Sequence, residues 1–323
     1  MKTIYAHTPY SHWLLIIGLL FTLTAHGEEY GAIEKKKSVI KIYDVSGKDN
    51  LLIDNQFGQV KINLWDKSEI RIDVKITANA NDDDRAQQYL NGVEIEDKKE
   101  GDQISIRTII NKNGNPDWNR KNNNGEKNFV HIDYTVSMPK NTPLIVKNRF
   151  GATNIPFFMA PLIVQSMHGS FSATDLSGSK NDIDVAYGKA EIQNLLNGNL
   201  DIAYSGGRIG TLKGSSKIKF SYSGGFKIDA LNESAENVDI QASYSSLTIP
   251  TENNNCNFDV TVSYGGFNYP SDRNVSFTQN DDERKDNSHR YTPRMTKQYI
   301  GKIGKGNGTN VKIVSKYGQV SLR

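Results

Sequence analysis

Cysteine is nearly absent from the sequence, since Cys256 is the single one among 323 residues. One thiol excludes an internal disulfide and any metal site made of several thiolates. Net charge is also small, because 39 lysines and arginines are almost balanced by 36 aspartates and glutamates, which leaves a formal charge of +3. A nucleic-acid-binding surface needs a concentrated positive field. We therefore expect no nucleic-acid partner.

Long apolar runs are missing after residue 27, so we expect no transmembrane segment in the mature chain. The one extended apolar run, residues 13–23, follows Lys2 and precedes the small residues of Ala25-His26-Gly27. This order is typical of a secretory signal peptide. An uncleaved N-terminal anchor is the alternative. The sequence thus predicts a signal peptide at residues 1–27 and an exported protein of the periplasm or the cell surface.

Motifs of known chemistry are absent too. The sequence has no G-x-S-x-G, no H-E-x-x-H, no phosphate-binding loop and no dinucleotide fingerprint. We therefore predict no catalytic, cofactor-binding or metal-binding residue and no cofactor, and we expect the protein not to be an enzyme.

What the chain does contain is a repeated step, in which an aromatic residue or a histidine is followed by Gly or Ser. The seven central copies are spaced by 18, 19, 17, 18, 22 and 20 residues. A fixed period of this kind indicates a repeat architecture. The nine steps are Phe57-Gly58, Phe150-Gly151, His168-Gly169, Tyr187-Gly188, Tyr204-Ser205, Tyr222-Ser223, Tyr244-Ser245, Tyr264-Gly265 and Tyr317-Gly318.

Apolar residues keep fixed positions around each step. One lies four residues before the aromatic in every copy, and alternating apolar residues return after it, as at Val60 and Ile62. Such alternation is typical of strands with one buried face, and the small residue marks a tight bend or a close approach. Hairpins and propeller blades are alternatives, but propeller repeats run to about 40 residues. The pattern predicts an all-β, right-handed parallel β-solenoid (β-helix) with an N-terminal β-rich portion.

Stacking of equivalent positions would turn the repeated aromatic residues into a ladder of rings, worth about 0.5–1.5 kcal/mol per pair beyond burial. On this interpretation the rings are buried and mainly structural. Tyr204→Ala and Tyr222→Ala would then each cost roughly 3–5 kcal/mol of stability. Rings that face solvent would instead form a binding stripe.

Three segments follow from these patterns. After the signal peptide, residues 28–143 form the β-rich portion, with one short helix predicted at residues 82–90 and a polar loop at 111–128. Residues 144–323 form the solenoid repeats, with a charged insertion at 271–294. These two irregular loops are the expected places for contacts with a partner.

Three residues before the aromatic, successive copies carry Asp184, Asp201 and Lys219. Carboxylates on adjacent coils are the groups that a glycosidase or a calcium site uses. Because a lysine follows, the column is more typical of a solvated face with interleaved charges. His168 takes an aromatic position without a partner carboxylate or thiol in the pattern, so we expect it to stack rather than to act as a ligand or base.

Residues 51–96, residues 132–155 and the successive Tyr-Gly or Tyr-Ser-Gly-Gly steps resemble the adhesin-like β-strand-repeat family of Bacteroidetes-type bacteria, which is similar to the head domain of autotransporter adhesins. The resemblance extends over essentially the whole mature chain. It implies a β-helical, exported protein without catalytic residues, although fold alone does not settle function.

The function expected from the sequence is that of a non-enzymatic, adhesin-like or scaffold protein of the bacterial envelope, with a surface glycan or a protein as its partner. One alternative is a carbohydrate-active β-helix enzyme, a polysaccharide lyase or hydrolase, that uses Asp184, Asp201 and Lys219. Another is an envelope-sensing component.

Overall fold

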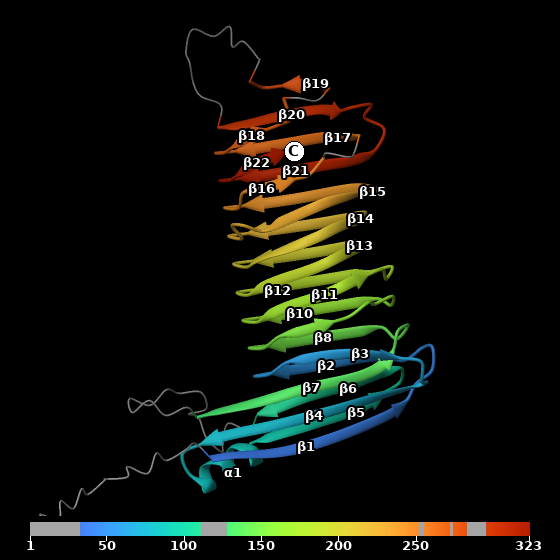
Figure 1. Cartoon of the computed structure of the whole chain (residues 1–323), viewed down its shortest axis with the longest axis vertical. Coiled ribbons are helices and arrows are strands. Elements are labelled where there is room, and N and C mark those ends of the chain that lie inside the picture. The colour runs from blue at the N-terminus through green and yellow to red at the C-terminus, as the bar shows by residue number, and fades with distance from the viewer. Residues whose placement is uncertain (1–32, 111–127, 252–254, 272–273, 283–294) are drawn as a thin grey trace, which may run out of the picture. The chain divides into compact units, whose positions relative to one another are not determined.

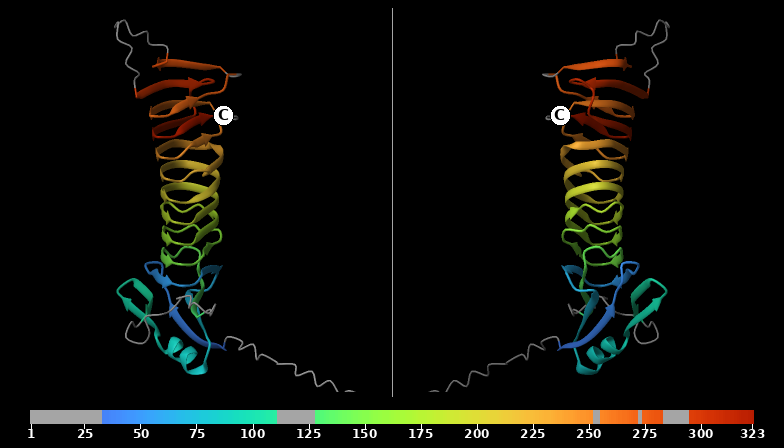
Figure 2. Two further views of the ribbon diagram at one scale, coloured as in Figure 1. Left: turned by 90° about the vertical axis from the view of Figure 1, so that its left-hand side faces the viewer. Right: turned by 90° about the vertical axis from the view of Figure 1, so that its right-hand side faces the viewer.

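The computed structural model describes residues 33–110, 128–251, 255–271, 274–282 and 295–323, and residues 32–323 form one compact unit. The predicted signal peptide, residues 1–27, lies outside the described residues. The described part of the chain forms twenty-two strands and one helix. The strands lie one above another, as Figure 1 shows, and Figure 2 shows the same stack from two sides.

The strands form two rows of hydrogen-bonded neighbours, and β13, β14 and β15 are long enough to run through both. In order, the first row contains β5 (Val93–Glu100), β6 (Gln103–Ile110), β2 (Asn50–Gln56), β8 (Leu144–Arg149), β10 (Leu162–Met167), β12 (Asn181–Ala186), the second halves of β13 (Lys189–Ala203), β14 (Gly206–Ser221) and β15 (Lys227–Ser243), and then β21 (Thr309–Lys316), β17 (Cys256–Ser263), β20 (Thr296–Ile303) and β19 (Val275–Asn280).

The second row begins with β1 and continues into the first halves of β13, β14 and β15. Its strands before β13 are β1 (Ile33–Asp44), β4 (Glu69–Ala80), β7 (Phe129–Pro139), β3 (Val60–Trp65), β9 (Thr153–Ile155) and β11 (Ser170–Leu176). A separate three-stranded sheet contains β16 (Leu247–Ile249), β22 (Gln319–Leu322) and β18 (Gly266–Asn268).

The predicted fold class, a right-handed parallel β-solenoid, is wrong. The two rows belong to one mixed, nearly closed sheet of nineteen strands. Strands β1, β4 and β7 pair antiparallel, as do β5 and β6, and at the other end β20 pairs antiparallel with both β17 and β19. The sequence pattern misleads because burial alternates with period two in parallel and antiparallel strands alike. Much of the antiparallel pairing comes from the segments predicted to lie outside the regular repeats, the β-rich portion at residues 28–143 and the charged insertion at 271–294.

Between the two ends the pairing is parallel and the repeats align in register. The apolar residue four places before each aromatic pairs with its equivalent in the next strand, and every member is at most 3% exposed. In spatial order these residues are Ile53, Val146, Val164, Ile183, Leu200, Ile218, Ile240, Ile313 and Val260. The predicted one-sided burial of the repeat strands is thereby confirmed.

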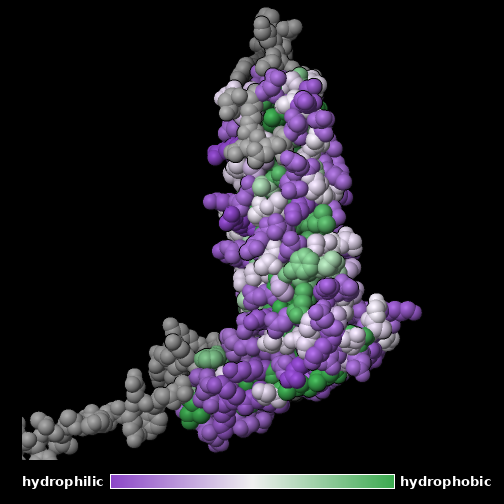
Figure 3. All heavy atoms as spheres, turned by 45° about the vertical axis from the view of Figure 1, so that its right-hand side comes forward, coloured by the Kyte–Doolittle hydropathy of each residue, from purple (hydrophilic) through white to green (hydrophobic). Residues whose placement is uncertain are grey.

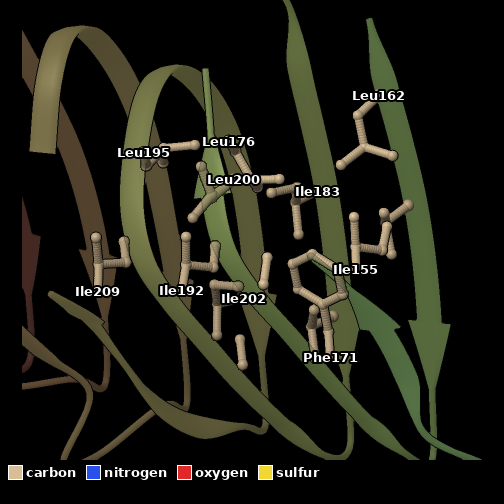
Figure 4. Packing of buried hydrophobic residues seen from close by; sticks show 14 of the residues in the cluster. Ile155, Leu162, Phe171, Leu176, Ile183, Ile192, Leu195, Leu200, Ile202 and Ile209 are labelled. Atoms are coloured by element: carbon tan, nitrogen blue, oxygen red, sulfur yellow. The ribbon is translucent and has the colours of Figure 1, made fainter. Parts of the chain in front are cut away.

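The inward side chains of the two rows meet in one hydrophobic core. Figure 4 shows part of it, where Ile183 and Leu200 from the first row point toward the second-row residues Phe171 and Ile192. All four side chains are at most 3% exposed. Burial of apolar surface on this scale is the main stabilising contribution in a chain whose only cysteine, Cys256, is itself buried.

The predicted helix at residues 82–90 is present as α1 (Asp83–Asn91). Asp82 caps its first turn, because the carboxylate accepts a hydrogen bond from the amide of Arg85 at 2.7 Å. Ala86, Tyr89 and Leu90 supply its buried face, and at the C-terminal end the amide of Gly92 donates to the carbonyl of Gln88 at 2.9 Å. The described residues contain no helix with the length and apolar character needed to cross a membrane.

Candidate functional site

The nine residues of the repeated step stack into one continuous column, which we call the aromatic ladder. Neighbouring ring centroids are 4.6 to 5.1 Å apart and the ring planes differ by only 3 to 14°. The predicted stacking is thus confirmed, including that of His168 between Phe150 and Tyr187. In spatial order the aromatic ladder contains Phe57, Phe150, His168, Tyr187, Tyr204, Tyr222, Tyr244, Tyr317 and Tyr264.

The expectation that these rings are buried is wrong. Tyr187, Tyr204 and Tyr222 are 52%, 50% and 49% exposed, and the other ladder tyrosines lie between 46% and 57%. The local backbone explains the exposure, since all nine residues have a positive φ of 50 to 62°. A non-glycine residue in this region forms a sharp corner, and the corner points its ring outward. The serines that follow Tyr204, Tyr222 and Tyr244 are buried, at most 4% exposed.

The small residue is required by the packing of one strand layer on the next, as the sequence predicts. A Cβ placed on Gly188 would lie 1.8 Å from the carbonyl oxygen of Gly169. Where serine replaces glycine, its hydroxyl accepts a hydrogen bond from the backbone amide of the neighbouring layer. Gly188 donates to Ser205 at 3.0 Å, Ser205 to Ser223 at 3.3 Å, and Ser223 to Ser245 at 2.9 Å. The corners of successive layers are therefore locked together.

The aromatic ladder offers ring edges and hydroxyl groups to a partner, because the faces of all rings except the two terminal ones are covered by their neighbours. Six consecutive rings are tyrosines, from Tyr187 to Tyr264 in space. Within the described part of the chain, none of these six hydroxyls has a hydrogen-bond partner. A half-exposed tyrosine combines apolar contact area with a polar tip, which is the reason tyrosine is enriched at interfaces.

The predicted charged column lies on the outer face of the first row. Asp184 pairs in register with Asp201, and Asp201 with Lys219, so the structure brings together the three residues that the sequence singles out. They line a shallow groove of about 530 Å³ together with Gln165 and Gln241, which we call the Asp184 groove. Sequence periodicity alone was sufficient to find this cluster.

Electrostatics within the Asp184 groove are dominated by one ion pair. The Nζ of Lys219 lies 2.7 Å from the Oδ2 of Asp201, and this hydrogen bond raises the pKa of Lys219. The pKa of Asp184 is also raised, first because its carboxyl group is partly shielded from water and second because it faces the negative charge of Asp201. The ion pair with Lys219 thus explains the position of the Asp201 carboxylate, and partial burial next to Asp201 explains the raised pKa of Asp184.

The structure describes only part of the two loops that the sequence predicts as contact regions. The polar loop at 111–128 and the charged insertion at 271–294 lie largely outside the described residues, and within the insertion β19 is formed. No cluster of three or more His, Cys, Asp or Glu side chains suited to a metal ion occurs among the residues that the structure describes.

A second groove, which the sequence analysis missed, lies on the outer face of the second row. It has a volume of about 1040 Å³ and crosses β3, β9, β11, β13 and β14. We call it the Phe157 groove, after an aromatic residue at its side that is 42% exposed. The sequence does contain an indication of this groove. The outward-facing residues of β11, Ser172 and Thr174, have shorter side chains than the outward-facing residues of the strands on both sides.

The face of the stack that Figure 3 shows is mostly polar. In Figure 3 the stack is covered by hydrophilic residues, and apolar residues form small separate patches rather than one continuous face. Among the large apolar residues that are exposed, those of the aromatic ladder form the one regular row in the described part of the chain.

No protein-family model and no curated protein matches the sequence. Similar solved structures include a candidate adhesin from Bacteroides fragilis, with a TM-score of 0.44, 10% identity and coverage of 90% of this chain and 98% of that chain. A candidate lipid-binding protein from Parabacteroides distasonis has a TM-score of 0.38, 9% identity and coverage of 89% and 97%. A candidate cell adhesion protein from Clostridium sporogenes has a TM-score of 0.26, 13% identity and coverage of 89% and 99%. With TM-scores below 0.5, these similarities assign no function to this chain.

Proposed function

We propose that this chain is a non-enzymatic, adhesin-like binding protein that contacts its partner through the aromatic ladder. The single observation that supports this function is the exposure of the ladder rings, together with the six tyrosine hydroxyls that have no partner among the described residues. Stacking explains why the rings are parallel. It does not require about half of each ladder tyrosine to remain in contact with water.

The physical chemistry of the aromatic ladder suits a macromolecular partner. All of its rings except the two terminal ones are held by neighbours on both sides, so binding costs little side-chain conformational entropy. Contacts would be made by ring edges and hydroxyl groups, which repeat at each strand layer. A partner with a long surface would therefore engage several weak contacts at once, and affinity would grow with the number of rings engaged.

Surface plasmon resonance on residues 28–323 tests this function. We would immobilise mucin, collagen and fibronectin as probes of extracellular surfaces. We expect saturable binding to at least one of them, weakened about tenfold or more in the Tyr204→Ala/Tyr222→Ala double variant, because truncated aromatic anchors at interfaces typically cost more than 1 kcal/mol each.

The matched control is Tyr269→Ala, which truncates a tyrosine that is 41% exposed but lies outside the aromatic ladder. Its binding should equal that of the unchanged protein. Full binding by the double alanine variant, or binding to none of the three probes, would contradict the proposed function.

The proposed location is the periplasm or the cell surface, and it rests on the signal-peptide pattern of residues 1–27. Protease treatment of intact and lysed cells separates the two locations. Cleavage on intact cells would support an adhesive role at the surface, whereas protection until lysis would restrict the partner to the periplasm.

One observation favours a second candidate, a polysaccharide lyase or hydrolase centred on the Asp184 groove. The raised pKa of Asp184 beside a second carboxylate is what a general acid needs. Against it, Lys219 already neutralises Asp201. Turnover of acidic and neutral polysaccharides, with and without calcium, decides between them: activity that is lost in Asp201→Asn would support the enzyme, and its absence at high protein concentration would count against it.

A further inference from the structure

We propose that the Phe157 groove is a second binding site, separate from the aromatic ladder, and that it takes an extended neutral oligosaccharide. The groove lies across five adjacent strands of the second row. At the usual inter-strand spacing, its length is roughly 19 Å. That length accommodates several sugar rings in a line.

The shape of the groove follows from the size of the outward side chains. On β11, Ser172 and Thr174 form a low floor, and Gly210 on β14 adds a position without a side chain. A Cβ placed on Gly210 would lie 2.5 Å from the carbonyl oxygen of Gln193, so the backbone there leaves no room for a larger residue. Gln193 on β13 lies between these two strands, and Phe157 follows β9 on the other side of β11.

The lining of the Phe157 groove contains hydrogen-bond donors and hydrogen-bond acceptors that are not used within the described part of the chain. Among the described residues, the side-chain amides of Asn63 and Gln193 and the hydroxyl of Thr174 have no hydrogen-bond partner. The amide of Asn154 uses its oxygen to accept from the hydroxyl of Ser172 at 2.7 Å, which leaves its NH2 group available. Amides that donate and accept match sugar hydroxyls, which also do both.

Phe157 provides the apolar contact that such a ligand needs. Its ring is 42% exposed, and no stacking ring accompanies it in the described part of the chain. The covered rings of the aromatic ladder differ in this respect, because their faces are already occupied. A sugar ring carries an apolar C–H face, which can pack on an exposed aromatic face while the hydroxyls reach the amides.

The charges of the groove favour a neutral ligand. Glu191 is paired with Lys189, whose Nζ lies 2.5 Å away, and Arg208 forms an ion pair with Asp229. Lys61 is the remaining charge at one end, so no cluster of cations is free to hold a polyanion.

The pairing of the strands makes a peptide strand a poor fit. β11 is hydrogen-bonded to β9 on one side and to β13 on the other. The floor therefore has no free backbone edge to which a peptide could add as a further strand. An apolar ligand is disfavoured as well, because the unpartnered amides would lose their water without gaining hydrogen bonds.

Isothermal titration calorimetry on residues 28–323 tests the site. The probes are cellohexaose, laminarihexaose, mannohexaose and maltohexaose, with a hexamer of galacturonic acid as the charged comparison. We expect at least one neutral hexamer to bind with a Kd of about 1 mM or below. Phe157→Ala should weaken this binding about tenfold, the loss typical of a truncated aromatic contact, whereas Phe157→Tyr should retain it.

Two further variants separate this site from the other surfaces. Gln193→Ala should also weaken binding, whereas Gln165→Ala, in the Asp184 groove, should leave it unchanged. The Tyr204→Ala/Tyr222→Ala variant should bind the hexamer normally. Loss of binding at the Phe157 groove is therefore distinguishable from loss of binding at the aromatic ladder. The proposal is overturned if no neutral hexamer binds at about 10 mM, if Phe157→Ala has no effect in a variant with unchanged circular dichroism, or if the galacturonate hexamer binds best.

Discussion

The ring of Tyr317 stacks on the ring of Tyr244 with a centroid distance of 4.6 Å, and its other face stacks on Tyr264 at 4.8 Å. The last repeat of the chain is thus inserted between two earlier ones. The strand pairing agrees, since β21 is hydrogen-bonded to β15 on one side and to β17 on the other. Order along the sequence is therefore not order in space at this end of the stack.

This insertion gives Ile313 on β21 a central role in stability. Its side chain is fully buried and lies in register between Ile240 and Val260. Ile313→Ala should lower the free energy of unfolding by about 2–5 kcal/mol, because it leaves a cavity between three strand layers. The side chain of the neighbouring Val314 faces outward, so Val314→Ala should lower the free energy of unfolding by less than about 0.5 kcal/mol. Urea unfolding followed by circular dichroism measures both, and equal losses would contradict the inserted position of β21.

The exposure of the aromatic ladder changes what truncation of a ring should cost. Tyr204→Ala and Tyr222→Ala each remove two stacking contacts, worth about 0.5–1.5 kcal/mol apiece, from a ring that is only half buried. We expect a loss of about 1–2 kcal/mol rather than the value for a buried ring. Tyr204→Phe, which keeps the ring, should be nearly neutral in the same unfolding experiment. A loss above about 3 kcal/mol would mean that the rings are buried in solution.

The close approach at the corners gives a sharper test of the stacked layers. Gly188→Ala should cost about 1–3 kcal/mol or more, because its Cβ would lie 1.8 Å from a backbone oxygen that cannot move without displacing the next layer. Gly206→Ala is the matched control, since a Cβ there meets no atom within 4 Å. Thermal unfolding of the two variants should differ clearly. Equal melting temperatures would argue against the register of β11 and β13, the strands that follow Gly169 and Gly188.

Much of this arrangement could be predicted from the sequence, because burial and bending leave a periodic trace. The positions of Ile183 and Leu200, the small residue after each aromatic, and the proximity of Asp184 to Asp201 all follow from the repeat. The cap of α1 at Asp82 follows from local chemistry. Each of these features depends on residues within one turn, within one repeat or at equivalent positions of successive repeats.

The remaining features depend on information that a period does not carry. Alternation does not distinguish the antiparallel pairing of β1 with β4 from parallel pairing. The outward direction of the Tyr204 ring depends on a positive φ, which no sequence pattern for tyrosine indicates. The short residues of the Phe157 groove, Ser172 and Thr174, are visible in the sequence. The side chains that surround them on the other four strands are identified only when the register is known.

The Asp184 groove predicts a pH dependence whose sign follows from the raised pKa of Asp184. Between the ordinary carboxyl pKa and the raised value, the folded protein binds more protons at this site than the unfolded chain does. Stability therefore decreases as pH rises through that interval, and the loss remains at higher pH. Asp184→Asn should stabilise the protein slightly at pH 7, by less than about 1 kcal/mol for so exposed a group, and should have no effect below the interval.

The cause of the shift can be tested directly by carboxyl carbon NMR titration of Asp184. Asp201→Asn removes the neighbouring negative charge and should lower the pKa of Asp184. Lys219→Met removes the nearby positive charge and should raise it further, because the lysine is the one neighbour that opposes the shift. Opposite changes in the two variants would establish that the column of Asp184, Asp201 and Lys219 is electrostatically coupled. Unchanged values in both would mean that water and salt screen these side chains from one another, which would also remove the basis for an acid–base role.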